Sequence, residues 1–331
     1  MQGEDFRHRG TAVIRAPSGL GLRPLRPGHE PGTWAAPAAL TRAGLLDRLR
    51  PDRVVDLDRP RYSPDPQPGT ILRNGPAIRR FNEAVAGAVD AVLQDRLFPI
   101  LVGGDCSILI GALAGARRHS DLALVHLDGH SDFRHPGNYE PELALHAVAG
   151  MDLALAIGLG DPAMLRWAGS EEAEAALADI GVTVRCLVPA DRAIQIGERE
   201  GREPDYGWWD IADTAITQID IFQALDAGMP EVLRRSFAVL DRTPDIPFWV
   251  HLDIDILDQA VMPAVDSPGS PGLGHDQLAA LLRGFAASPR CLGLDVTIFD
   301  PDLDPDGTLA RDLVDMLARG LAPLARPDAR A

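Results

Sequence analysis

Acids and histidines are concentrated in the stretch VHLDGHSDF, residues 125–133. Asp128, His130 and Asp132 lie two residues apart there, directly after an apolar run. Because side chains alternate along a strand, residues i, i+2 and i+4 can share one side. We therefore expect two carboxylates and an imidazole to gather where a buried strand ends.

A second stretch, PFWVHLDID, also ends an apolar run with acids two residues apart, Asp253 and Asp255. Surface or capping acids would explain either stretch alone. Together, four carboxylates and one imidazole at one sheet edge would repel one another and resist desolvation. One or two divalent cations remove that cost, and carboxylate-rich sites suit Mn²⁺, Mg²⁺ or Fe²⁺ more than structural zinc. Two cations about 3.5–4 Å apart can also share a water and lower its pKa. We interpret His126 and His251, inside the two runs, as core histidines or as supports for the ligands.

Short apolar runs alternate with longer helical patterns along the chain. This alternation predicts βαβ units and an α/β fold with a mostly parallel sheet. Continuous apolar strands indicate that both sheet faces are covered, and ligand sites of such folds lie beyond the carboxyl ends of the strands. We expect one domain over 1–331, with 322–331 a frayed tail. Helices are predicted at 36–49 and 74–97, and strands at 11–18, 53–58, 98–105, 121–128, 182–188, 193–197, 247–255 and 291–299.

The composition excludes several classes of function. The net charge is −16 and the sequence contains no lysine, which argues against nucleic-acid binding, P-loop phosphate binding and lysine Schiff bases. The three cysteines, Cys106, Cys186 and Cys291, lack the spacing of a disulfide framework or a zinc motif. No apolar run is long enough to cross a bilayer and no signal core is present. We expect a soluble, cytoplasmic protein.

Three motifs together resemble the arginase/agmatinase (ureohydrolase) family. They are GGDCS (103–107), DGHSD (128–132) and HLDIDILDQAVMPAVDSPGSPGL (251–273), and the resemblance runs from about Val13 to Pro301. It implies a three-layer αβα fold, two divalent cations per chain, Mn²⁺ foremost, and a homo-oligomer, a trimer or hexamer. It also implies that a metal-bridging hydroxide attacks the guanidino or amidino carbon of a small polar substrate.

By matching position, the resemblance implies metal ligands, and it makes Asp132 a catalytic residue that accepts a hydrogen bond from the hydroxide. The family's first ligand, a histidine, is Cys106 in this chain. Cys106 either binds the metal as a thiolate or is a small buried residue beside a weaker site. The expected ligands are Cys106, Asp128, His130, Asp132, Asp253 and Asp255.

The substrate-binding positions differ from the family pattern. The glutamate that grips a guanidinium is replaced by Ile298 in GLDVTIFDP (293–301). Asp266 or Asp300 either takes over that role or is a solvated loop acid. Ser267, at a family threonine position, is expected to face the substrate.

The loop that carries the family's proton-shuttling histidine reads GNYEP (137–141), with Glu140 at the histidine position. A buried glutamate can act as a general acid or base. His135 and His146 are nearby alternatives, His146 for catalysis and His135 for substrate binding. Asn138 matches the asparagine of the same loop and is expected to contact the substrate.

These features favour a metal-dependent hydrolase of C–N bonds in linear amidines. The altered positions argue for an N-substituted guanidine, an N-hydroxyguanidine or a formimino compound rather than arginine or agmatine. One alternative is a non-catalytic metal-binding or regulatory subunit. Another is a metal-dependent hydrolase of a different bond, such as an amide.

Overall fold

An eight-stranded sheet forms the centre of the molecule. The computed structural model describes residues 8–140, 143, 145–160, 164, 186–201 and 209–325. Strands lie in the order β2-β1-β3-β8-β7-β4-β5-β6, and every neighbouring pair is parallel. The predicted α/β fold is confirmed, with a sheet that is parallel throughout. The strands are β1 (Gly10–Ala16), β2 (Arg53–Asp56), β3 (Leu97–Gly103), β4 (Ala123–Leu127), β5 (Ala193–Ile196), β6 (Thr217–Ile219), β7 (Phe248–Asp253) and β8 (Cys291–Thr297).

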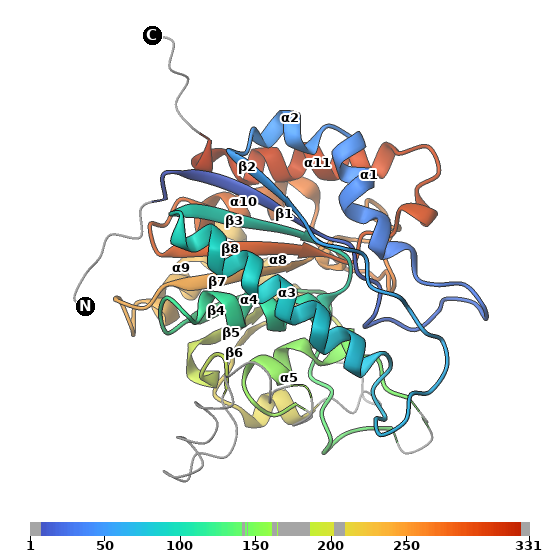
Figure 1. Cartoon of the computed structure of the whole chain (residues 1–331). Coiled ribbons are helices and arrows are strands. Elements are labelled where there is room, and N and C mark those ends of the chain that lie inside the picture. Colours follow the sequence, from blue (N-terminus) through green and yellow to red (C-terminus); the bar gives the residue numbers. More distant parts are fainter. Residues whose placement is uncertain are drawn as a thin grey trace.

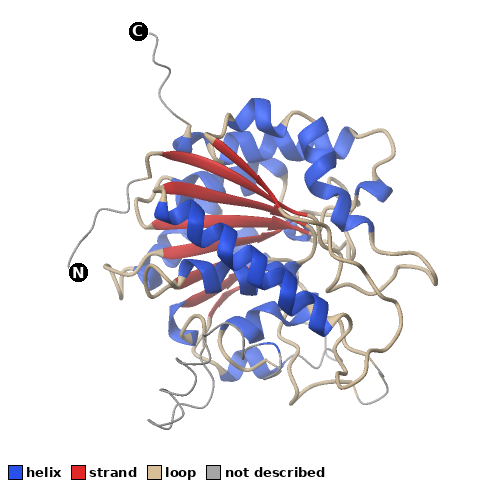
Figure 2. Ribbon diagram, in the orientation of Figure 1, coloured by secondary structure: helices blue, strands red, loops and turns tan. Residues whose placement is uncertain are grey.

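Helices cover both faces of the sheet and complete three layers (Figure 1, Figure 2). One face packs against α3 (Gly75–Gln94), α4 (Leu109–Ala116) and α5 (Asp152–Ala156). Side chains alternate between the faces, so Ile14 joins this core and Val13 joins the opposite one. The opposite face packs against α1 (Ala36–Arg42), α2 (Leu45–Leu49), α8 (Ile221–Ala227), α9 (Met229–Leu240), α10 (His275–Ala286) and α11 (Thr308–Gly320).

The helix predicted at 36–49 is divided into two. α1 ends at Arg42, and Gly44, with a φ of 98°, turns the chain before α2 begins. No strand was predicted at β6, and residues 186–188 of the strand expected at 182–188 are not a strand, while 182–185 lie outside the described residues. Ala322–Leu324 form a 3₁₀ turn where we expected the frayed tail to begin; 326–331 lie outside the described residues.

The middle of the sheet brings the sequence motifs together. β8 and β7 lie between β3 and β4, so the loops after all four strands leave the same edge. Asp128 follows β4, Asp253 ends β7, and the GGDCS loop follows β3. The register pairs His126 of β4 with His251 of β7. Within the described residues, no helix is long and apolar enough to cross a membrane.

Candidate metal centre

A cavity of about 410 Å³ opens at the carboxyl edge of the central strands. Four of the expected ligands line it: His130, Asp132, Asp253 and Asp255. Asp128 is fully buried. We refer to Asp128, His130, Asp132, Asp253 and Asp255 as the carboxylate cage.

Short contacts join the two halves of the carboxylate cage. His130 Nδ1 lies 2.8 Å from Asp255 Oδ2, and the backbone N–H of His130 donates to Asp128 Oδ1 at 2.6 Å. The backbone N–H of Asp255 donates to Asp253 Oδ1 at 2.8 Å. Asp128 Oδ2 is buried without a hydrogen-bond partner. The backbone thus fixes the carboxylates but leaves this oxygen unsatisfied.

The pKa values of the cage reflect burial and mutual repulsion. Burial, and then the Asp128 and Asp152 carboxylates, raise the pKa of Asp132 well above its ordinary value. Burial, followed by Asp255 and Asp128, does the same to the pKa of Asp253. Burial alone would lower the pKa of His130, but Asp255 and Asp128 raise it well above 6.5. Oxygen-rich donors and an unsatisfied buried oxygen fit divalent cations, which would offset this repulsion.

Known proteins share both the sequence pattern and the fold. A model of the arginase family matches residues 14–320. The chain belongs to the arginase family. An arginase of Bacillus caldovelox is 28% identical to this family member over 302 residues, 88% of this chain and 91% of that protein. The solved structure of arginase from Bacillus caldovelox matches with a TM-score of 0.76 at 25% identity, over 94% of this chain and 98% of that one. A formimidoylglutamase structure from Bacillus subtilis shares the fold, with a TM-score of 0.66 at 18% identity, over 95% and 86% of the two chains.

In this arginase-family chain Cys106 contacts the cage from the protein interior. It begins the 3₁₀ turn Cys106–Ile108 and is fully buried. Its Sγ donates to Asp253 Oδ2 at 2.9 Å and lies 3.2 Å from Thr297 Oγ1. Burial, followed by the charge of Asp253, raises the pKa of the thiol well above its ordinary value. A cation would therefore have to displace the thiol proton to gain the sulfur as a ligand.

The polar side chains of the loop after Asp132 form hydrogen bonds and an ion pair within that loop. The backbone N–H of His135 donates to Asn138 Oδ1 at 2.8 Å, and Asn138 Nδ2 donates to the Phe133 carbonyl at 3.0 Å. Glu140 forms an ion pair with Arg134 at 2.5 Å.

His146 stacks on Tyr139 with ring centroids 4.1 Å apart, and burial, with nearby Arg23, lowers its pKa. The cavity wall includes neither His146 nor His135, Asn138 and Glu140, so this arrangement does not support their predicted roles. The wall there is formed instead by Arg134, Ala147, Ala149 and Gly150.

The substrate loop does reach the cavity. Asp266 and Ser267 both line it, and the Ser267 hydroxyl donates to Asp266 Oδ2 at 3.3 Å. Burial raises the pKa of Asp266. Asp300 instead accepts hydrogen bonds from the backbone N–H groups of Gly32 and Asp302, at 3.2 and 2.9 Å. These hydrogen bonds use both oxygens of the buried Asp300 carboxylate, and a role toward the substrate stays a prediction.

Ile298 lines the cavity in an unusual backbone conformation. Its φ is +74°, a region that β-branched residues rarely adopt. Its N–H donates to the Gly104 carbonyl at 2.7 Å, which ties the end of β8 to the GGDCS loop. Strain of this kind persists where the surrounding structure enforces it, often at functional sites.

Sequence reasoning missed two charged residues near the cage. Asp152, the first residue of α5, is fully buried close to His126 and His251. Its signal was a lone acid inside the apolar run VAGMDLALAIGLG (148–160). Arg199 is 8% exposed and donates from Nη2 to the Asp255 carbonyl, so it brings positive charge beside the cage. No pattern in its neighbourhood indicated this.

Proposed function

We propose that this chain hydrolyses a C–N bond in a small linear amidine, with two divalent cations, Mn²⁺ foremost, held by the carboxylate cage. The observation that carries the proposal is the convergence of His130, Asp132, Asp253 and Asp255 on one cavity. Membership of the arginase family supports it. The names of two relatives, arginase and formimidoylglutamase, support a guanidino or formimino carbon as the reacting centre.

The cage residues would have different roles in such a reaction. Two bound cations supply a water of lowered pKa as the nucleophile. Asp132 lines the cavity, where its carboxylate is placed to accept the water proton and return it to the leaving nitrogen. Asp255 holds the His130 ring by its Nδ1. Asp266 and Ser267 offer an acceptor and a donor to the substrate's nitrogen-bearing end.

The cavity wall favours a substrate less cationic than arginine at its reacting end. Ile298 cannot pair with a guanidinium, whereas Arg23 supplies positive charge at the same cavity. Guanidinium groups bind carboxylates well. We therefore propose a substrate that carries a carboxylate and an N-substituted guanidino, N-hydroxyguanidino or formimino group.

A substrate panel tests this function. The Mn²⁺-loaded chain is incubated with arginine, agmatine, guanidino acids, N-hydroxyguanidines, formimino amino acids and, as the class control, acetylated amines. Release of ammonia, urea or a substituted urea from a carboxylate-bearing amidine is expected. Turnover of the acetylated amines alone would replace the proposal with amide hydrolysis.

Loss of metal by cage variants is the matching test of the site. Asp128→Ala and Asp253→Ala each remove a carboxylate, and we expect loss of bound Mn²⁺ by elemental analysis and loss of any activity. Asp226→Ala is the control, because Asp226 is exposed on α8. Full Mn²⁺ occupancy in both cage variants would refute the site.

The alternative is a non-catalytic, metal-binding or regulatory role. The ion pair between Glu140 and Arg134 favours this alternative. Glu140, the predicted acid–base residue, is engaged in that pair and does not line the cavity. Full metal occupancy without turnover of any panel substrate would favour this alternative.

A further inference from the structure

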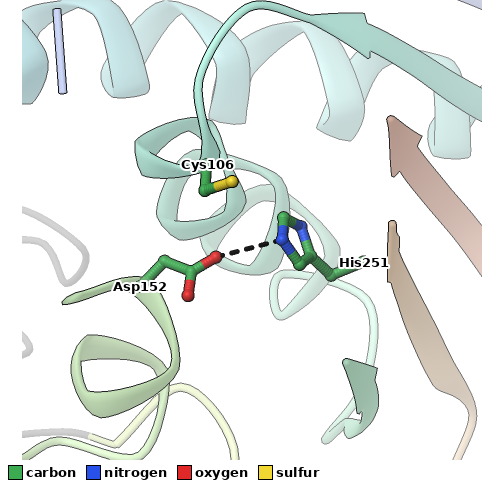
Figure 3. Close-up of side chains that lie close together, drawn as sticks. All are labelled: Cys106, Asp152 and His251. Carbon is green, nitrogen blue, oxygen red and sulfur yellow. Dashed lines mark ion pairs between the residues drawn. The ribbon is translucent and has the colours of Figure 1, made fainter. Parts of the chain in front are cut away.

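A second group of potential ligands lies in the protein interior behind the carboxylate cage. Cys106, Asp152 and His251 come from the GGDCS loop, the start of α5 and strand β7, and their side chains approach one another (Figure 3). One ligand atom from each lies within 4.8 Å of the other two. All three side chains are fully buried, and none of them lines the cavity.

Two of these ligand atoms face each other and make no other contact of this kind. They are Asp152 Oδ2 and His251 Nε2, which form a fully buried ion pair at 3.2 Å. Burying charged groups is costly even when they are paired, so a native structure rarely keeps such a pair without a reason. In a tetrahedral site with bonds of about 2.0–2.1 Å, two ligand atoms lie about 3.3 Å apart. The observed separation matches that of two ligands of one ion.

Neighbouring groups orient both of these side chains. His251 Nδ1 lies 2.5 Å from Asp295 Oδ2, and the other oxygen of Asp295 accepts from Trp249 Nε1 at 2.6 Å. This contact leaves Nε2 to face Cys106 and Asp152. A carboxylate behind the far nitrogen of a histidine is the usual support of a metal-binding imidazole.

Asp152 is held in the same manner. Its Oδ1 lies 3.1 Å from His126 Nε2, so Oδ2 is the oxygen left to face His251. The His126 ring stacks on the His251 ring at 4.6 Å and fixes both. A neighbouring ligand group shares His251 with this cluster and consists of His126, Asp128 and His251.

We propose that this cluster binds a zinc-like divalent cation through Cys106 Sγ, Asp152 Oδ2 and His251 Nε2. Sulfur, imidazole and carboxylate donors suit Zn²⁺ or Co²⁺ better than Mn²⁺. None of the three ligands lines the cavity, so the ion is held in the protein interior. Binding releases the thiol proton of Cys106 and any proton on His251 Nε2. The proposal assigns Cys106 to this deep site, and it does not depend on amidine hydrolysis.

The unmodified chain provides the direct test. Crystals of the full chain are grown with Zn²⁺ as the only added divalent metal, and diffraction at the zinc edge locates the ion. An anomalous peak within bonding distance of Cys106 Sγ, Asp152 Oδ2 and His251 Nε2 is expected. Zinc found only among Asp132, Asp253, Asp255 and His130, or no zinc, would overturn the proposal.

Co²⁺ absorption tests the ligands in solution. The Co²⁺-loaded chain should show a thiolate-to-cobalt charge-transfer band that is lost in Cys106→Ser and retained in Cys291→Ser, the control with another buried thiol changed. Asp152→Asn and His251→Gln should each weaken Co²⁺ binding at least 10-fold.

Asp295→Asn keeps all three ligands and weakens the support of His251, so it should cost about 10–100-fold in affinity. Far-UV circular dichroism checks that each variant is folded. If the charge-transfer band is absent from the unmodified chain, or keeps its intensity and affinity in folded Asp152→Asn and His251→Gln, the deep site is excluded.

Discussion

We expect Cys106 to influence which metal the chain prefers, because it is a sulfur donor among oxygen and nitrogen donors. Its Sγ lies 2.9 Å from Asp253 Oδ2, so a histidine at this position would present an imidazole to the cage. We expect Cys106→His to raise Mn²⁺ affinity and lower Zn²⁺ affinity, since imidazole suits both ions and thiolate suits mainly zinc. Competition against a fluorescent chelator measures both affinities. Unchanged affinities for both metals would place Cys106 outside any metal site.

The gathering of the cage residues could be predicted from the sequence because both acidic stretches follow buried strands of a parallel sheet, whose carboxyl ends share one edge. Asp128, His130 and Asp132 follow β4 at the predicted spacing, and Asp253 and Asp255 follow β7. Loop paths obey no such rule. The hydrogen bonds between His135, Asn138 and Phe133 that turn the loop after Asp132 depend on three-dimensional contacts.

Asp152 shows the other limit of sequence reasoning at this scale. It is the only acid at the apolar start of α5, and the pairing of β4 with β7 is what brings His126 and His251 close to it. A search for periodicity or for motifs treats each of these residues separately. Their proximity follows from the strand order, which the sequence patterns did not specify.

Between elements, close contact of two loops holds the GGDCS turn in place. A Cβ at Gly104 would lie 1.5 Å from the Ser18 carbonyl oxygen, which belongs to the loop after β1. Gly104→Ala must therefore push the two loops apart, and we expect it to lower the free energy of unfolding by about 3 kcal/mol or more. It should also weaken metal binding, because Cys106 follows two residues later. Urea unfolding and Mn²⁺ titration measure the two effects.

Gly87→Ala is the matched control for that substitution. Gly87 lies within α3, and a Cβ there would have no atom within 4 Å. Alanine is favoured over glycine in a helix interior by about 1 kcal/mol, so this variant should be more stable than the parent. Equal stability of Gly104→Ala and the parent would show that the loops yield without cost.

An ion pair joins α3 to the segment after α4. Asp90 accepts from Arg118 Nη1 at 2.7 Å and lies 2.9 Å from His119 Nε2. Burial alone would raise the pKa of Asp90, but its hydrogen bonds with Arg118 and His119 lower it. A lowered folded pKa stabilises the protein above the unfolded value of about 3.9, and this contribution is lost as pH falls through the folded pKa.

Asp90→Asn should therefore lower the free energy of unfolding at pH 7 by up to about 1 kcal/mol. The difference from the parent should shrink and disappear as pH falls through the lowered pKa of folded Asp90. Urea unfolding at several pH values measures it, with Glu83→Gln on an exposed position of α3 as control. A difference that persists in acid would assign the effect to packing rather than to charge.

Elements that are long and strongly apolar could be predicted, and those decided by single residues could not. β7 and β8 are buried along their whole length, so their apolar runs marked them clearly. β6 has three residues with only one fully buried, too few to form a pattern. The division between α1 and α2 depends on the left-handed conformation of Gly44. An amphipathic pattern does not reveal this break.

Over the whole molecule, acidic residues outnumber basic ones by 16. Part of this excess lies in the buried centre, where Asp128, Asp132, Asp152, Asp253 and Asp255 share one region.

The trimeric or hexameric assembly expected from the family stays a prediction, which sedimentation of the metal-loaded chain would measure. The cytoplasmic location likewise stays a prediction.

We expect the concentration of acids in the centre to make the stability of the whole chain depend on metal. The raised pKa of Asp253 means that its charged form is disfavoured in the folded state. A raised folded pKa stabilises below the unfolded value, and this contribution is lost as pH rises. At pH 7, without a cation, Asp253 therefore costs stability. Asp253→Asn should unfold at a higher temperature than the parent in chelator.

Mn²⁺ should reverse the order of stability, so that the parent unfolds at a higher temperature than Asp253→Asn. A ligand at 100 times its Kd adds about 2.7 kcal/mol per site to the folded state, and Asp253→Asn forfeits this gain with its carboxylate. Calorimetry of both chains, each in chelator and in Mn²⁺, measures the crossing, with exposed Asp226→Asn following the parent in both conditions. If Asp253→Asn were less stable than the parent in chelator as well, Asp253 would serve the fold through its hydrogen bonds from Asp255 and Cys106. A crossing would mean that these acids are kept for the cation at the expense of the metal-free fold.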